Sequence, residues 1–157
     1  MKIISGFPPN IQQIREYLTP PPQAVFAFGE TIYNPSGNEI RADILYHENV
    51  HFRQMEAYPS SEIWWTKYLI DKDFRLKMEV EAYGEQVAFV KRHATNKVVK
   101  ELLDQIAETL EKHYNLGITK YQAHALIRNY PSQTLQVVSP LLSRPPSSWR
   151  DGFSHFE

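Results

Sequence analysis

The segment from Asn38 to Tyr58 contains neither glycine nor proline, and it constrains the fold of this chain more than any other feature. A turn signal, Asn34-Pro35-Ser36-Gly37, precedes the segment, and Pro59 follows it. Apolar side chains recur near helical spacing, at Ile40, Ile44, Leu45, Phe52 and Met55. The pattern therefore predicts a helix from about Arg41 to Ala57.

The middle of this predicted helix carries the sequence HENVH. Residues four apart lie on the same face of a helix, so His47 and His51 can present their imidazoles to one ion. Glu48 lies one step round the helix, within reach of a water on that ion. This is the H-E-x-x-H arrangement of catalytic zinc sites, which keep one coordination position for water. It predicts His47 and His51 as Zn²⁺ ligands and Glu48 as the catalytic general base.

A third ligand is expected from the sequence MEVEAYGEQ. Glu79, Ala82, Tyr83 and Gln86 share one face of a predicted helix, whereas Glu81 points ~160° away from Glu79. Small Ala82 would let this helix approach the first one. We therefore favour Glu79 as the third ligand, with Glu81 as the alternative. Tyr83 is expected beside a ligand or as a donor to the oxyanion.

The remaining residues predict one mostly helical α+β domain, residues 1–131. A short helix follows Asn10 as its cap, and an extended segment from Val25 to Tyr33 bends at Gly29. Further helices are expected to begin at Ser60 or Ser61, at Asp71 or Asp73, at Thr95 and at Thr119. Residues 132–157 are rich in proline and serine, and form either a strap over the domain or a flexible tail.

Other side chains receive smaller roles. Trp64, Trp65 and Tyr68 are expected to fill the core beside the HENVH helix, and Arg75 to pair with a carboxylate. His124, on the last predicted helix, would help to stabilise the oxyanion if that helix closes over the site; Tyr121 is its alternative.

Composition excludes several classes of partner. The formal net charge of the 157 residues is −1, so no basic excess favours nucleic acid or an anionic membrane. Without cysteine, a metal site must use histidine and carboxylate ligands.

The N-terminal MKIISGFPPN is too short an apolar run for a signal peptide, and no stretch is apolar enough to span a membrane. A cytoplasmic location, in the producing or host cell, is expected. Oligomeric state stays open.

HENVH followed by a glutamate in E-x-x-A resembles the gluzincin branch of zinc metallopeptidases. More narrowly, residues 30–86 look like the small zincin-like peptidases of phages and prophages, through ETIYNP, LYHENVHFRQ, WWTKYLIDKDFR and EVEAYGEQ. The resemblance implies a zincin-like domain in which an edge strand near Glu30 to Asn34 lies along the cleft and pairs with extended substrate. It also implies the ligands and base named above.

One position departs from the gluzincin pattern. An acidic residue often stands four places after the third ligand and orients a ligand histidine, but Tyr83 stands there in this chain. Another acceptor must then hold the second N–H of that histidine. Asp43, one turn before His47, is one candidate, and a backbone carbonyl is the other.

These observations favour a zinc-dependent metallopeptidase, in which Glu48 assists attack of zinc-bound water on a peptide bond. Its partner would be a peptide or protein substrate. The alternative is a catalytically silent zinc-binding protein of the same fold that serves as a phage-type binding or structural module. A helical protein without metal is a third interpretation.

Overall fold

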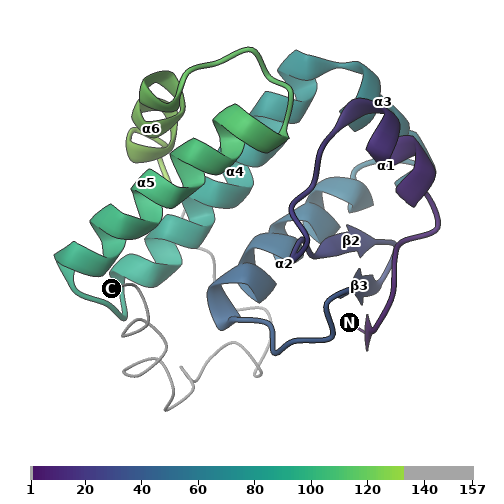
Figure 1. Cartoon of the computed structure of the whole chain (residues 1–157), viewed down its shortest axis with the longest axis horizontal. Helices are drawn as coiled ribbons and strands as arrows, with labels where there is room; N and C mark the ends of the chain where they lie inside the picture. Colours follow the sequence, from purple (N-terminus) through teal and green to yellow (C-terminus); the bar gives the residue numbers. More distant parts are fainter. Residues whose placement is uncertain (1, 133–157) are drawn as a thin grey trace.

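The computed structural model describes residues 2–132, which form six helices and one three-stranded sheet (Figure 1). The elements are β1 (Lys2–Ile4), α1 (Ile11–Tyr17), β2 (Phe26–Phe28), β3 (Thr31–Tyr33), α2 (Ala42–Glu56), α3 (Ser61–Ile70), α4 (Lys72–Lys91), α5 (Asn96–His113) and α6 (Lys120–Arg128). The mostly helical α+β prediction is confirmed. The predicted tail, residues 132–157, lies outside the described residues except for Ser132.

The sheet has the order β1-β3-β2. β2 and β3 form an antiparallel hairpin, and Gly29 in its turn has a φ of 60°, which glycine adopts without strain. β1 pairs with β3 in parallel, so β3 is the central strand. The expectation of an edge strand near Glu30 to Asn34 is therefore wrong. The edge strand beside α2 is β2, and the pairing of β1 was not predicted from the sequence.

Helix starts follow the predicted caps with one exception. The side chains of Ser60, Asp71 and Thr95 accept hydrogen bonds from the first turns of α3, α4 and α5. Thr119 and Gln122 form a capping box at α6. Asn10 precedes α1 but makes no such bond with its side chain, so its predicted capping role is wrong.

The molecule has two halves joined by α4 (Figure 1). One half contains α5 and α6; the other contains the sheet, α1 and α3. α4 contacts α2, α3, α5 and α6. It is consequently buried on most of its circumference. This burial places the polar residues of α4 in the interior, where each needs a polar partner.

Arg75 of α4 ties two helix ends together. Its guanidinium donates to the carbonyl oxygens of Tyr68 and Leu69 at the end of α3. It also donates to those of Tyr114 and Asn115 after α5. The predicted carboxylate partner is replaced by these carbonyls, which have no intrahelical donors because they lie at helix C-termini. Trp64, Trp65 and Tyr68 are buried beside α2, as predicted.

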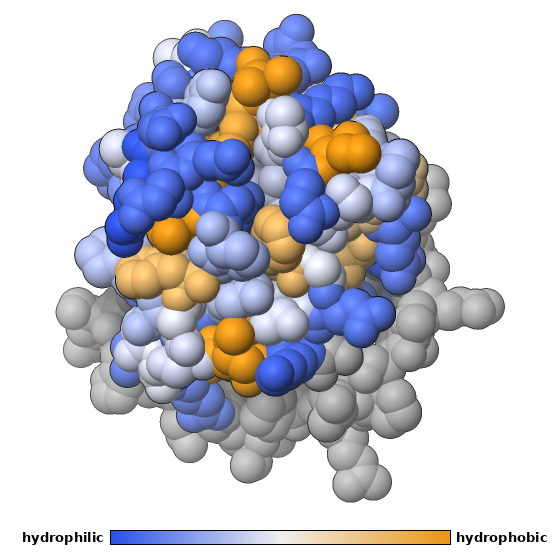
Figure 2. All heavy atoms as spheres, turned by 90° about the vertical axis from the view of Figure 1, so that its right-hand side faces the viewer, coloured by the Kyte–Doolittle hydropathy of each residue, from blue (hydrophilic) through white to orange (hydrophobic). Residues whose placement is uncertain are grey.

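The face formed by α1, α3 and the sheet carries hydrophobic side chains as separate patches among hydrophilic ones (Figure 2). Exposed members in this half of the chain are Ile3, Phe7, Tyr17, Ile63 and Ile70. Scattered exposure of this kind is ordinary for a folded surface. Among the described helices, none has the length and apolar character needed to cross a membrane.

Candidate metal centre

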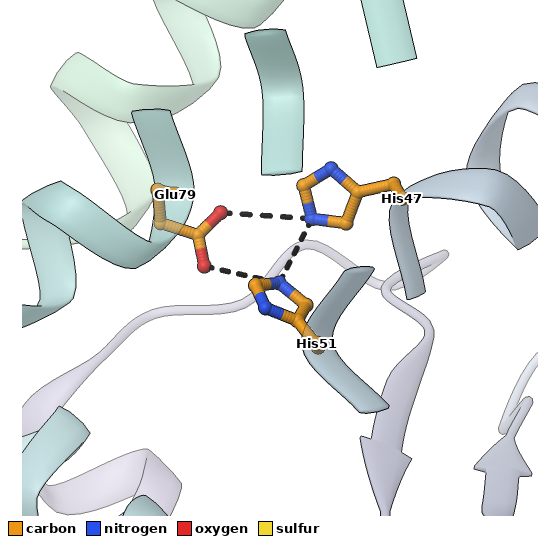
Figure 3. A group of neighbouring side chains, drawn as sticks. All are labelled: His47, His51 and Glu79. Carbon is orange, nitrogen blue, oxygen red and sulfur yellow. Dashed lines mark hydrogen bonds and ion pairs between the residues drawn. The ribbon is translucent and has the colours of Figure 1, made fainter. Parts of the chain in front are cut away.

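His47 and His51 from α2 meet Glu79 from α4 in the interior (Figure 3). The two Nε2 atoms lie 3.0 Å apart. Nε2 of His47 is 3.6 Å from Oε2 of Glu79, and Nε2 of His51 is 3.3 Å from Oε1 of Glu79. All three residues are buried. The predicted trio is therefore brought together, with one ligand atom available from each residue.

The spacing of these atoms fits a metal ion. Tetrahedral ligands held at ~2.0–2.1 Å from zinc lie ~3.3–3.4 Å from one another, close to the three distances observed. Oε2 of Glu79 is also buried without a hydrogen-bond partner among the described residues. An unpaired carboxylate oxygen in the interior is costly unless a cation balances it. His47, His51 and Glu79 thus lie close enough, and have the donor types, to bind a metal ion.

A side-chain amide orients His47. Nδ1 of His47 lies 3.1 Å from Oε1 of Gln86, and Nε2 of Gln86 donates to Asp43 at 2.7 Å. Because the Gln86 amide nitrogen is used by Asp43, its oxygen faces His47 and accepts the Nδ1 proton. Asp43 therefore acts through Gln86 rather than directly. The Nε2 lone pair of His47 is left pointing into the centre.

Gln54 does the same for His51. Its Oε1 lies 2.8 Å from Nδ1 of His51, and its Nε2 donates to the carbonyl of Met78 and to Glu81. The amide oxygen consequently accepts the Nδ1 proton of His51. Neither predicted acceptor, the Asp43 carboxylate or a backbone carbonyl, contacts a ligand histidine directly. Glu81, the alternative ligand, faces Gln54 and lies outside the cluster.

Charge around the two histidines favours a cation between them. Burial lowers the pKa of His47 to about 4, with a further contribution from His51. Burial also disfavours charge on His51, but Glu79 and Glu48 outweigh it and raise the pKa of His51 to about 9. Burial opposes the charge of Glu79 too, yet His51 and His47 hold the pKa of Glu79 below its usual range. The centre is therefore built around one shared cation, either a proton or a metal ion.

Tyr68 completes the surroundings of Glu79. Its hydroxyl donates to Oε1 of Glu79 at 2.6 Å. A short hydrogen bond to a carboxylate restricts its rotation and holds Oε2 toward His47. The sequence predicted Tyr68 only as a core residue, because α3 had to be packed on α4 before the contact could be seen.

Glu48 lies beside the cluster and is also buried. Burial raises the pKa of Glu48 to about 8, whereas the charge of His51 and a hydrogen bond from the backbone N–H of Ala27 act in the opposite direction. A carboxylate with a pKa near neutrality can both accept and return a proton. Glu48 is thus a buried carboxyl group whose surroundings raise its affinity for a proton.

A cavity of about 460 Å³ opens on these groups. Glu48, both histidines and Glu79 contribute to its lining, together with residues 18–27, residues 34–41 and one face of α5. Its volume falls within the ~300–1,000 Å³ typical of sites for small molecules. The candidate metal centre is thus adjacent to a space that a ligand could enter.

The chain was compared with family models, curated proteins and solved structures. None of them matches it. The resemblance to gluzincins therefore rests on the motif residues alone.

Of the two residues expected to contact the oxyanion, Tyr83 lines the cavity and His124 does not. The Tyr83 ring lies 4.3 Å from the His47 ring, and its hydroxyl is 2.9 Å from that of Tyr114. Both tyrosines line the cavity. His124 does not reach it: α6 packs on α5 and α4, and Nε2 of His124 lies 3.7 Å from Asp104. His124 was expected to stabilise the oxyanion only if α6 closed over the site, and α6 does not do so. Tyr121 is 84% exposed.

Proposed function

We propose that this protein is a zinc-dependent metallopeptidase with a zincin-like fold. The observation that carries the proposal is the convergence of His47, His51 and Glu79 in one buried cluster, with Glu48 lining the same cavity. Two histidines, one carboxylate as the third ligand and an adjacent glutamate are the donor set and base of a hydrolytic zinc site. Zinc is favoured over magnesium or calcium because two ligands are imidazoles.

Zinc held by these three side chains would polarise a substrate carbonyl and make a bound water more acidic. Glu48 accepts one proton from the attacking water as its oxygen adds to the carbonyl carbon. The same carboxyl then donates that proton to the amine nitrogen as the C–N bond breaks. Water and a peptide bond thus become one carboxylic acid and one amine. The raised pKa of Glu48 favours retention of the proton by this carboxyl between the two transfers.

Tyr83 and Tyr114 supply a candidate donor to the oxyanion. Their hydroxyls carry two protons, and the bond between them uses one. The pair can donate the other proton to an oxygen in the cavity. Such a donor stabilises negative charge that develops on the carbonyl oxygen.

The test is cleavage of a denatured protein mixture by the zinc-loaded protein, read by mass spectrometry of new peptide ends. Glu48→Gln should keep zinc and lower the cleavage rate by ~10²–10⁴-fold, the contribution of a general base. Equal cleavage by both forms would refute the proposed mechanism. Zinc binding by both with cleavage by neither would support the silent zinc-binding alternative instead.

A further inference from the structure

Strand β2 lies next to Glu48, and its residue beside Glu48 is Ala27. Both backbone polar groups of Ala27 are already hydrogen-bonded. Ala27 is the middle residue of β2 and is 2% exposed. Its carbonyl accepts a hydrogen bond from the indole of Trp65 at 3.0 Å, and its N–H donates to Glu48. A substrate backbone that paired with β2 would need the N–H and the carbonyl of Ala27. Both groups are instead hydrogen-bonded to side chains of the protein, Glu48 and Trp65.

The two walls of the cavity carry almost no charge. One wall is a face of α5, formed by Leu102, Gln105, Ile106 and Thr109 at spacings of three and four. The facing wall is the segment from Leu18 to Val25, including two prolines. These side chains are apolar or neutral amides and hydroxyls. They would desolvate an ionised substrate side chain without offering it a partner.

Charged residues lie toward the loop of residues 34–41. Glu39 and Arg41 contribute to the lining there. The Arg41 guanidinium already forms an ion pair with Asp43, donating at 2.9 Å and 2.6 Å. The charged side chains of this loop therefore lie at one region of the cavity and not along the two walls.

The two walls are joined where α5 ends. Nδ1 of His113 lies 2.8 Å from the carbonyl of Thr19, and the Thr19 N–H donates to the carbonyl of His113 at 3.4 Å. Asn115 donates to the carbonyl of Tyr17 in the same region. Leu18 and His113 also line the cavity. These bonds hold the end of α5 against the start of the Leu18–Val25 segment.

From these contacts we infer that the cavity binds short peptides with uncharged, mainly apolar side chains. They are held through side-chain contacts with α5 and the Leu18–Val25 segment. They are not held by strand pairing at Ala27, and a long chain does not pass between Thr19 and His113. The inference rests on the proposed peptidase function. It assigns to Gln105, which is exposed on the α5 wall, a part in selecting the substrate.

The test uses the zinc-loaded full chain and two sets of synthetic peptides. One set consists of tetrapeptides with leucine, glutamate or lysine at each position; the other embeds the same tetrapeptides in longer peptides. Mass spectrometry gives kcat/KM for each. We expect the leucine tetrapeptides to be cleaved at least ~10-fold faster than the charged ones and than their embedded copies. Equal or faster cleavage of charged or embedded sequences would overturn the inference.

Gln105→Glu supplies the matched variant. It adds one negative charge to the α5 wall and should shift preference from leucine toward lysine peptides, with zinc content unchanged. Lys100→Gln makes the same change in net charge at an exposed position of α5 outside the cavity lining and should leave preference unchanged. An unchanged preference in Gln105→Glu would also overturn the inference. Failure of the wild type to cleave any peptide would refute the proposed function itself.

Discussion

The Nε2 atoms of His47 and His51 face each other at 3.0 Å across one turn of α2. Two lone pairs cannot face each other at this distance in the interior without a proton or metal ion between them. Because Gln86 and Gln54 accept the Nδ1 protons, the Nε2 atoms are the ones directed into the centre. The arrangement predicts a measurable gain in stability on metal binding.

Zinc at ~100 times its dissociation constant should stabilise the protein by ~2.7 kcal/mol, which corresponds to a rise in Tm of ~10 °C. His51→Ala should remove this shift because it deletes a ligand. His93→Ala, at an exposed position, should keep it. Thermal unfolding followed by circular dichroism, with and without zinc, checks the prediction. A shift of equal size in His51→Ala would place the metal elsewhere.

Substitution of either glutamine should weaken zinc binding while the fold is retained. Gln86→Leu and Gln54→Leu each remove the acceptor that orients one ligand histidine. Loss of such an acceptor lowers metal affinity by ~10–100-fold. Gln13→Leu, on the exposed side of α1, is the control and should bind zinc as wild type does. Competition with a chromophoric chelator measures the three affinities. Wild-type affinity in both glutamine variants would contradict this role.

Arg75→Met should destabilise the fold by ~3 kcal/mol or more, because several buried carbonyls lose a charged donor. Arg75→Lys retains the charge without the planar fork and should recover part of the loss. Arg92→Met, at an exposed position, should change stability by no more than ~0.5 kcal/mol. Urea denaturation gives the three values. Equal effects at the two arginines would show that the carbonyl contacts do not matter.

Gly84→Ala should also destabilise the fold. A Cβ at this position would lie 2.1 Å from Cδ1 and 2.8 Å from Cβ of Tyr130, so the whole tyrosine would have to move. Overpacking of this kind costs ~1–3 kcal/mol. The cost should fall when Tyr130 is also replaced by alanine, because the clash is then absent. A double-mutant cycle in urea checks this. An unchanged cost in the Tyr130→Ala background would mean that Tyr130 is not the cause.

The sequence predicted the parts of the site that depend on helical periodicity. HENVH lies on α2, and Glu79, rather than Glu81, faces it because i and i+4 positions share a face. Positions i and i+3 also share a face, so helical spacing alone is consistent with the contact of Gln54 with His51. The gluzincin pattern predicts acidic partners for the ligand histidines, whereas this chain uses amides.

Contacts between segments distant in sequence could not be predicted in this way. β1 has only three residues, and its partner β3 begins at Thr31, so no local pattern signals the pairing that makes β3 central. Tyr68 reaches Glu79, and Trp65 reaches Ala27, only after α3 packs on α4 and the sheet. These contacts depend on tertiary packing, which a single sequence does not encode in any short motif.

Zinc binding by His47, His51 and Glu79 is tested directly by the zinc content of the full chain after dialysis against zinc and then against metal-free buffer. Atomic emission spectroscopy of wild type and His51→Ala, each checked for folding by circular dichroism, gives the metal-to-protein ratio. We expect one zinc ion per folded wild-type chain and none per folded His51→Ala chain. A folded wild type that retains no zinc, or a His51→Ala variant that retains as much as wild type, would contradict this expectation.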